Sequence, residues 1–257
     1  MSSVIDLLKS HRSIRKFTDK AIDPDVLNNI FLAGQAAATS SFLQGSTIIR
    51  VQNKSTRESL ARLAGNQPYV ESAAEFMIFC ADLKRAGNYC KEYGKPFEGD
   101  YTEHFIIATV DVALMAQSLV TAAESVGLGI CYIGGIRNNP VDVSKLLELP
   151  IGVYPVFGLC LGYPDQDPEI KPRLPLSVIL KDEVYNERGD QEKIREYDEK
   201  IRDYYRTRTG GGHGISWTEQ VATLLSEKSR PHIKAFLEEQ GFKFKFFFAN
   251  NEPKPFP

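Results

Sequence analysis

The feature that most constrains the fold is a run from about Glu103 to Val126 that is apolar on nearly all sides. A helix of this kind must be enclosed by protein, either in a core or in a subunit interface. Three polar residues, Asp111, Gln117 and Glu124, interrupt the run and leave fewer than the roughly 20 apolar residues that a membrane span needs. We therefore expect a soluble protein built around a buried helix. Its apolar residues are Phe105, Ile106, Ile107, Val110, Val112, Leu114, Met115, Leu119, Val120 and Val126.

Helices and short buried strands alternate along the first two-thirds of the chain. Asp23 followed by Pro24 predicts a helix start, because Asp caps the free N–H groups and Pro fits the first helical position. Ser55 with Glu58 predicts a capping box at another helix. Further patterns predict strands at 76–81, 128–133 and 153–161, and a helix that begins at Asn139-Pro140 and ends before Pro150.

The composition changes after about Lys171. The segment 181–208 is dense in charge, and its narrow apolar stripe predicts a helix: Ile194, Tyr197, Ile201, Tyr204 and Tyr205. A glycine-rich loop at 210–214 precedes a helix capped by Ser216 and Glu219, and the last helix is expected from 229 to 241. We therefore expect one domain over residues 1–241 with an excursion at about 176–215. The tail at 242–257 has no assigned role.

Charge and cysteine usage exclude several classes of protein. The 31 basic and 33 acidic residues give a net charge of −2, so nothing favours nucleic acid or an anionic membrane as a partner. The N-terminus predicts a short helix opened by Ser3 and Asp6, and it lacks the pattern of a secretory signal. The four cysteines form no CxxC pair and do not cluster with histidines, which favours free buried thiols in a reducing cytoplasm over a metal site.

Several polar groups could carry chemistry, although each alone fits an ordinary surface loop or helix end. Two guanidiniums, an imidazole and a hydroxyl at 11–15 suit an anion such as phosphate. No GxSxG, HExxH or complete nucleotide-binding glycine motif is present. The candidate groups are His11, Arg12, Ser13 and Arg15; Thr39, Ser40 and Ser41; Gln67 and Tyr69; Lys171 and Arg173; and Arg230.

Seven short motifs, which follow one another along the chain, contain most of these groups. They are His-Arg-Ser-Ile-Arg-Lys-Phe at 11–17, Ser-Ser-Phe-Leu-Gln at 40–44, Gly-Asn-Gln at 65–67, Ala-Ala-Glu-Phe at 73–76, Ala-Ala-Glu-Ser-Val-Gly-Leu-Gly at 122–129, Tyr-Ile-Gly-Gly-Ile-Arg-Asn at 132–138 and Lys-Pro-Arg-Leu-Pro at 171–175. Together they resemble the oxygen-insensitive NADPH nitroreductase and NADPH-flavin oxidoreductase group of the nitroreductase superfamily. The resemblance extends from about residue 5 to residue 241.

The resemblance implies an α+β fold with a mixed β-sheet flanked by helices, in an intertwined homodimer. It also implies two non-covalent FMN molecules at the subunit interface, with NADPH as reductant. The residues implied to bind FMN are His11, Arg12, Ser13, Lys171 and Arg173 at the phosphate and ribityl end, Arg15 at the pyrimidine edge, Thr39, Ser40 and Ser41 from the other subunit, Gln67 and Tyr69 beside the ring, and Tyr132, Ile133, Gly134 and Gly135 near N5. No side chain is implied as a nucleophile or acid, because the cofactor carries the chemistry.

For the other substrates, the resemblance implies that Arg208 meets the NADPH 2′-phosphate, with Arg206 as an alternative, and that Arg230 lies near the electron acceptor. The expected activity is two-electron, ping-pong reduction of nitroaromatics, quinones or flavins. Two alternatives stay open: a dedicated reductase that supplies reduced FMN, and a flavin-binding module without turnover.

Overall fold

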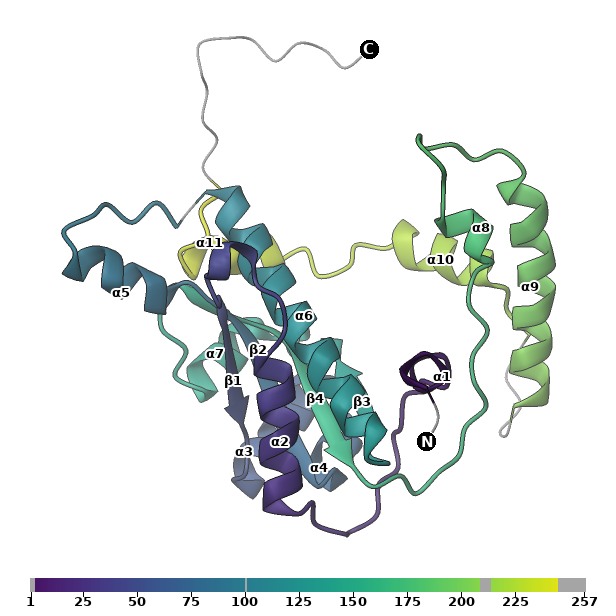
Figure 1. The fold of residues 1–257 in the computed structure, drawn as a ribbon, viewed down its shortest axis with the longest axis horizontal. Coiled ribbons are helices and arrows are strands. Elements are labelled where there is room, and N and C mark those ends of the chain that lie inside the picture. Colours follow the sequence, from purple (N-terminus) through teal and green to yellow (C-terminus); the bar gives the residue numbers. More distant parts are fainter. Residues whose placement is uncertain (1–2, 100, 209–213, 245–257) are drawn as a thin grey trace. The chain divides into compact units, whose positions relative to one another are not determined.

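The computed structural model describes residues 3–99, 101–208 and 214–244, which form two compact units (Figure 1). The first, which we call the sheet unit, comprises the N-terminus to Leu8, Ser13–Gln166, and the chain from His232 onward. The second, which we call the excursion unit, comprises Lys9–Arg12 and Asp167–Pro231. The predicted excursion at 176–215 falls within the second unit.

A four-stranded antiparallel sheet forms the centre of the sheet unit. Its order is β1 (Ser46–Arg50), β2 (Glu75–Asp82), β4 (Val153–Gly162) and β3 (Gly129–Ile133). A parallel bridge between Ser13 and Ile130 adds the segment after the first helix beside β3. The α+β class is confirmed, and so are the three predicted strands. The strand β1 was not predicted.

Side-chain alternation along β2 explains why the sheet has a core on each face. Met77, Phe79 and Ala81 pack with α2 (Pro24–Gln35) and α6 (Thr102–Ser125) on one face. Phe76, Ile78 and Cys80 pack with α3 (Lys54–Leu63) and α7 (Pro140–Leu146) on the other. Every residue of β2 after Glu75 is buried, as expected for a strand covered on both sides. Burial of each large side chain contributes about 1.5–3 kcal/mol.

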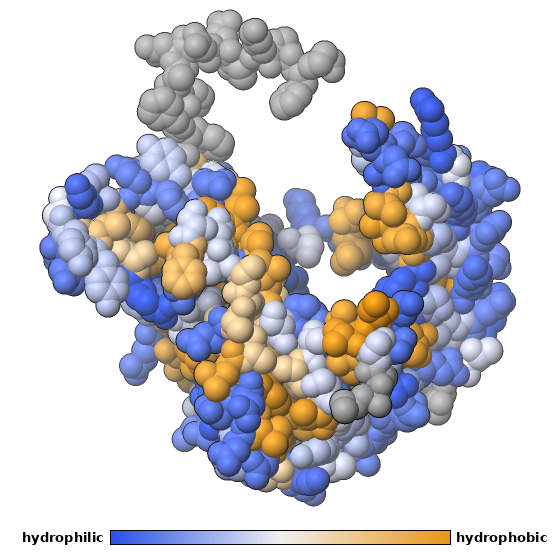
Figure 2. Space-filling view, viewed as in Figure 1, coloured by the Kyte–Doolittle hydropathy of each residue, from blue (hydrophilic) through white to orange (hydrophobic). Residues whose placement is uncertain are grey.

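The helix α6 is the predicted apolar helix, and it presents two different apolar faces. Its inner face is buried through Ala108, Asp111, Val112, Ala116, Leu119, Val120 and Ala123. Its outer face leaves Ile106, Val110 and Leu114 exposed, and Figure 2 shows apolar surface where α6 runs. Its length and hydropathy match those of a membrane-crossing helix. Because α6 packs on the sheet and buries a carboxylate, it is a core helix of the sheet unit.

The predicted capping residues are confirmed at three helices and wrong at a fourth. Asp23 accepts hydrogen bonds from two backbone N–H groups of α2, and capping boxes open α1 (Val4–Lys9) and α10 (Trp217–Ser226). The capping box of Ser55 with Glu58 is wrong, because Asn53 caps α3 by accepting from the Thr56 N–H at 3.1 Å. The remaining elements of the sheet unit are η1 (Ser40–Phe42), α4 (Tyr69–Ser72), α5 (Lys84–Glu92), η2 (Gly134–Asn138) and α11 (Ile233–Glu239).

The excursion unit contains α8 (Leu176–Ile179), α9 (Asp190–Thr207) and α10. The predicted apolar stripe of α9 is confirmed, since Tyr197 and Ile201 are buried. Buried Asp198 accepts hydrogen bonds from the backbone N–H and hydroxyl of Thr218, which fixes α9 against α10. Lys181 and Asp190 form an ion pair at 2.6 Å. The predicted glycine-rich loop lies almost wholly outside the described residues.

The tail begins inside the sheet unit. Phe242 is buried, and the Phe244 ring lies 5.1 Å from that of Phe105. The tail therefore starts as part of the core that contains α6, whereas its remaining phenylalanines lie beyond the described residues.

Candidate active site

The segment after α1 places two predicted residues beside β3. The backbone N–H of Ile14 donates to the carbonyl of Ile130 at 2.8 Å. Ile14 is buried in the core, which fixes the path of the segment, whereas Arg15 is exposed. Ser13 pairs with Ile130 as the parallel bridge. The strand edge, and not a helix end, therefore positions Ser13 and Arg15.

A chain of polar contacts joins Arg15 to the end of α3. The Tyr69 hydroxyl donates to Gln67 Oε1 at 2.7 Å, and Gln67 Nε2 donates to the carbonyl of Ala64 at 2.8 Å. Burial raises the pKa of Tyr69, an effect that the adjacent Arg15 guanidinium opposes. Tyr69 is thus a neutral hydroxyl at physiological pH, and three of the predicted residues form one polar cluster.

The turn after β3 packs against the same cluster. A Cβ atom at Gly135 would lie 2.2 Å from the Ala64 carbonyl oxygen and 2.7 Å from Gln67 Nε2, so only glycine fits there. A Cβ atom at Gly134 would meet Arg137 Nη2 at an ordinary 3.6 Å. Ile133 is fully buried, so only its backbone is available to a ligand.

Tyr132 faces away from this cluster. Its ring packs edge-on against Phe157 at 5.1 Å, in the core shared with α6. Burial, with a smaller contribution from Glu124, raises the pKa of Tyr132 to about 12. The structure therefore brings Arg15, Gln67, Tyr69 and Gly135 together, and it places the Tyr132 side chain on the other face of β3.

Two thiols lie beneath the cluster. Cys131 and Cys160 are directly opposite each other on β3 and β4, and the Cys160 thiol lies 3.4 Å from the carbonyl of Tyr69. Burial raises the pKa of both thiols, so both are protonated near pH 7. All four cysteines are free. Within the described ranges, no group of three or more His, Cys, Asp or Glu side chains could hold a metal ion.

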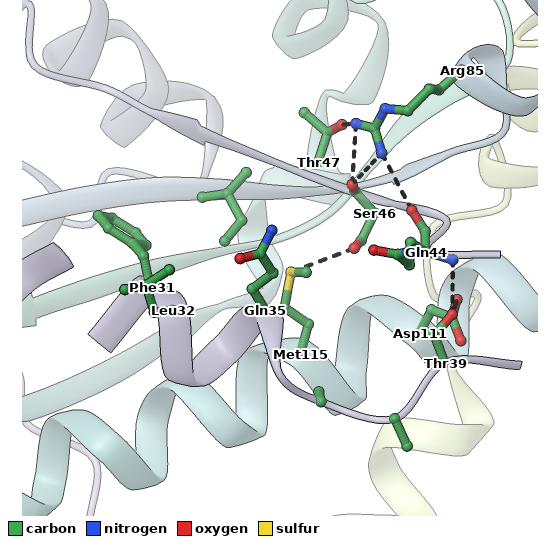
Figure 3. A pocket seen from close by; sticks show the side chains of 13 residues that line it. Phe31, Leu32, Gln35, Thr39, Gln44, Ser46, Thr47, Arg85, Asp111 and Met115 are labelled. Atoms are coloured by element: carbon green, nitrogen blue, oxygen red, sulfur yellow. Dashed lines mark hydrogen bonds between the residues drawn. The ribbon is translucent and has the colours of Figure 1, made fainter. Parts of the chain in front are cut away.

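The predicted hydroxyl loop lies elsewhere in the sheet unit, between α2 and β1. Thr39, which Figure 3 shows beside Asp111, donates to that carboxylate of α6. The Ser40 backbone N–H also donates to Asp111, at 3.0 Å. A pocket of about 500 Å³ adjoins this loop and is lined by Phe31, Gln35, Thr39, Gln44, Ser46 and Met115 among others. The pocket does not include Arg15, Gln67 or Tyr69.

Asp111 is the residue whose role was not predicted. The sequence marks it only as an interruption of an apolar helix. The available signal was physical: a carboxylate within a helix that must be enclosed has to be buried, and a buried charge needs hydrogen-bond partners.

The predicted phosphate-binding cations lie in the excursion unit, where several already have partners. Arg12 pairs with Asp167 at 2.7 Å, and it also donates to the carbonyl of Pro168 at 3.3 Å. Lys171 Nζ donates to the Tyr205 hydroxyl at 2.7 Å. Arg173 is exposed beside Tyr197, and His11 is half-buried.

The two predicted substrate arginines also belong to the excursion unit. The Arg208 guanidinium lies 5.8 and 5.9 Å from the ring centroids of Tyr204 and Tyr205, a cation–π arrangement. The alternative, Arg206, pairs with Asp203 at 3.2 Å. Arg230 has a positive φ of 49°, in the turn that precedes α11. Arg208 and Arg206 are both exposed.

The fold and the polar cluster define the class of protein. The chain belongs to the nitroreductase family: the family model matches residues 8–163, and the model of the family's C-terminal domain matches residues 171–245. The boundary between the matches falls close to the boundary between the two units.

Particular relatives match the chain over nearly its whole length. The NADPH-flavin oxidoreductase of Vibrio harveyi is 43% identical, covering 94% of this chain and 98% of the relative. The oxygen-insensitive NADPH nitroreductase of Salmonella typhimurium is 41% identical, covering 94% and 99%. The solved structure of the NADPH:FMN oxidoreductase from Vibrio harveyi with NAD⁺ superposes with a TM-score of 0.86 at 42% identity, covering 94% and 99% of the two chains.

The residues of the sheet unit fit the requirements of a flavin. A flavin ring presents hydrogen-bonding groups along its pyrimidine edge, and its reduction adds negative charge there. Arg15 supplies an exposed cation, while Gln67 and Tyr69 supply an amide and a neutral hydroxyl in the same cluster. The absence of a Cβ atom at Gly135 lets the backbone approach this cluster closely. The donor set and the tight turn therefore suit FMN.

Proposed function

We propose that this protein is an FMN-dependent NADPH oxidoreductase that reduces nitroaromatics, quinones or flavins by two electrons at a time. The observation that carries the proposal is the near-complete alignment with an NADPH-flavin oxidoreductase and an NADPH nitroreductase, at 43% and 41% identity. The Arg15, Gln67 and Tyr69 cluster supplies the chemical groups that this activity needs.

The functional form in this proposal is a cytoplasmic homodimer with FMN at the interface. The outer face of α6 supports dimer formation, since Ile106, Val110 and Leu114 are 49%, 49% and 43% exposed in the single chain and would be buried by a second copy. Thr39, Ser40 and Ser41 would then serve the FMN of the other subunit. The four free cysteines fit a reducing compartment.

In the mechanism, FMN held at this site would supply the redox chemistry, the transfer of two electrons from NADPH to the acceptor. Arg15 would provide a positive charge at the pyrimidine edge, where reduction adds negative charge. Gln67 and Tyr69, which are bonded to each other, would orient the ring, and the turn at Gly134 and Gly135 would bring backbone close to it. The chain needs no nucleophile or acid of its own.

The excursion unit would bind the charged ends of the ligands. Its residues His11, Arg12, Lys171 and Arg173 would hold the FMN phosphate, together with Ser13 of the sheet unit, and Arg guanidiniums bind phosphate through paired hydrogen bonds. Arg208 would bind the NADPH 2′-phosphate, and Arg230 would lie near the acceptor. A dedicated reductase that supplies reduced FMN stays the alternative to a nitroreductase.

The decisive experiment is a spectrum of the purified, FMN-loaded protein. Anaerobic NADPH should bleach the flavin band, and a nitroaromatic or quinone should restore it. Faster turnover with free FMN than with a nitroaromatic would favour the dedicated flavin reductase, which the Vibrio harveyi relative supports. Bound FMN that NADPH cannot reduce would contradict the proposal and favour a flavin-binding module.

Arg15→Ala tests the electrostatic part of the mechanism. Removal of the cation should lower the two-electron potential of bound FMN by about 30 mV, which corresponds to about 1.4 kcal/mol. Redox titration of the loaded protein measures this shift. The neighbouring Lys16→Ala is the control, because Lys16 is exposed and lies outside the polar cluster. If bound FMN has the same two-electron potential in both variants, Arg15 does not stabilise the reduced flavin.

A further inference from the structure

The carboxylate of Asp111 is buried, and it accepts hydrogen bonds from a single loop. The residue lies in the middle of α6, is 3% exposed, and is surrounded by apolar residues of that helix. Its carboxylate accepts from the Thr39 hydroxyl, from the Ser40 N–H at 3.0 Å and from the Gly45 N–H at 3.3 Å. All three donors belong to the loop between α2 and β1, which we call the serine loop (residues 39–45). Hydrogen bonds of this kind offset the cost of burying a carboxylate.

The serine loop holds a backbone conformation that needs such support. Ser41, Phe42 and Gln44 have φ values of 50°, 56° and 54°, in the left-handed region that side chains other than glycine disfavour. Holding a residue other than glycine in this region costs free energy. A free loop of this sequence would relax from the conformation, so the contacts with Asp111 stabilise it.

The contacts also decide which hydroxyls face outward. Thr39 turns inward: its hydroxyl donates to Asp111 and accepts from the Gln44 N–H at 2.8 Å, which closes the loop on itself (Figure 3). Ser40 and Ser41 are exposed. Because the Ser40 N–H is fixed to Asp111, the backbone that carries the two serine side chains is fixed as well.

A second set of contacts holds the other end of the loop. Arg85 donates to the carbonyl of Gln44 at 3.3 Å, and the Asp82 N–H donates to the carbonyl of Gly45 at 2.9 Å. These contacts do not reach Ser40 or Ser41. Loss of the Asp111 carboxylate would therefore release the part of the loop that carries the serines and leave its junction with β1 in place.

We propose that Asp111 is a positioning residue of the FMN site, which presents Ser40 and Ser41 to the FMN of the other subunit. Asp111 and Thr39 act from within the protein, and the two exposed serines are the groups that meet the cofactor. This inference rests on the proposed function, since it assumes that the serine loop serves FMN.

Two variants test the proposal and one controls it. Asp111→Asn keeps the volume but turns one acceptor oxygen into an NH₂ group, which opposes the N–H donors of the loop. Thr39→Val removes the inward hydroxyl without touching α6. Thr109→Val is the matched control: its hydroxyl, also on α6, bonds to the Phe105 carbonyl at 2.6 Å and to Tyr154, away from the serine loop.

Three measurements separate positioning from general stability. FMN affinity is measured by the fluorescence change on titration of the apoprotein. Hydrogen exchange in the apoprotein follows the Ser40 and Gly45 amides, whose protons bond to Asp111. Sedimentation reports the oligomeric state. Exchange and sedimentation do not depend on FMN binding or on activity.

We expect Asp111→Asn to raise the FMN dissociation constant at least about tenfold and Thr39→Val about fivefold, with faster exchange confined to residues 39–45. Thr109→Val should change the constant less than about twofold. Faster loop exchange with unchanged FMN affinity would overturn the proposal, and so would dissociation of the oligomer in both variants. A wild-type protein that binds no FMN would instead refute the proposed function, whatever the exchange data show.

Discussion

The two groups of predicted FMN residues are held in opposite ways. In the sheet unit, polar groups are fixed by buried partners: Asp111, which holds Thr39, is 3% exposed, and Gln67 is bonded to the Ala64 backbone. In the excursion unit, Arg12 pairs with an Asp167 side chain that is 83% exposed. An exposed pair of this kind contributes little to stability, because water and salt screen it.

The polar groups of the sheet unit are held in place before a ligand binds. The cations of the excursion unit are held by contacts that a ligand can replace. A flavin ring offers few strong contacts, so its neighbours need a fixed geometry. A phosphate group can displace an exposed carboxylate such as that of Asp167, because it carries more negative charge and also accepts paired hydrogen bonds from Arg. Changes in the first group should therefore affect the protein's own structure as well as binding, and changes in the second should affect binding alone.

Gly135→Ala should have the largest effect, on the fixed group. The added Cβ atom would lie 2.2 Å from the Ala64 carbonyl oxygen, so backbone must move. We expect the free energy of unfolding in urea to fall by about 2–3 kcal/mol. Gly134→Ala is the control, since its Cβ atom would make an ordinary contact at 3.6 Å. Similar losses in both variants would mean that the close contact with Ala64 is not what holds the turn.

Arg12→Ala should weaken binding and leave stability unchanged. Loss of a charge-assisted contact to phosphate costs about 2 kcal/mol, or about 30-fold in the FMN dissociation constant. The melting temperature of the apoprotein should stay within about 1 °C, because Asp167 is exposed. Arg202→Ala, which removes the arginine of another surface pair, is the control. A large drop in melting temperature for Arg12→Ala would show that this cation of the excursion unit also stabilises the fold, against the comparison drawn above.

Arg208→Ala should change the KM for NADPH and not that for NADH. Its cation lies over the Tyr204 and Tyr205 rings, and loss of a 2′-phosphate contact should raise the KM for NADPH about tenfold, or about 1.4 kcal/mol. Steady-state rates with NADPH and NADH measure this, and the KM for NADH should barely change. Arg206→Ala is the matched comparison. If Arg206→Ala shows the larger NADPH effect, the role belongs to Arg206 instead.

Asp167→Asn should have the smallest effect, in the opposite direction. It removes the carboxylate that competes with phosphate for Arg12, so FMN should bind about twofold more tightly, in line with the ~0.5 kcal/mol of an exposed pair. Titration at low and high salt measures this, and the gain should shrink as salt rises. Weaker binding in this variant would show that Asp167 orients Arg12 and does not compete for it.

Much of the fold could be predicted because local patterns carry it. The apolar run predicts α6, Asp23-Pro24 predicts the start of α2, and alternation or apolar runs predict three of the four strands. The strand β1 was missed because its five residues, of which only two are strongly apolar, gain their pairing from β2. The cap of α3 was misassigned because Asn53 and Ser55 are both good caps, and the backbone path decides between them.

Local sequence patterns predict less of the candidate site than of the fold. Thr39, Ser40 and Ser41 are equivalent as a sequence of hydroxyls, yet one faces a buried carboxylate and two face solvent. Tyr132 lies within a motif that the sequence analysis assigns to the FMN site. Because side chains alternate along β3, its ring lies on the face of the sheet opposite to the Arg15, Gln67 and Tyr69 cluster. These outcomes depend on long-range contacts, such as that between residues 39 and 111, which no local pattern records.

The helix α6 is synthesised before the core that it packs against is complete. During synthesis its 24 residues leave the ribosome after α2 and β2 but ahead of β3 and β4, so a segment with the hydropathy of a membrane span is briefly only partly covered. An aspartate near the middle of such a segment disfavours insertion into a bilayer by about 2.5–3.5 kcal/mol. The carboxylate that shapes the serine loop in the folded protein also makes the nascent chain a poor substrate for the membrane-insertion machinery.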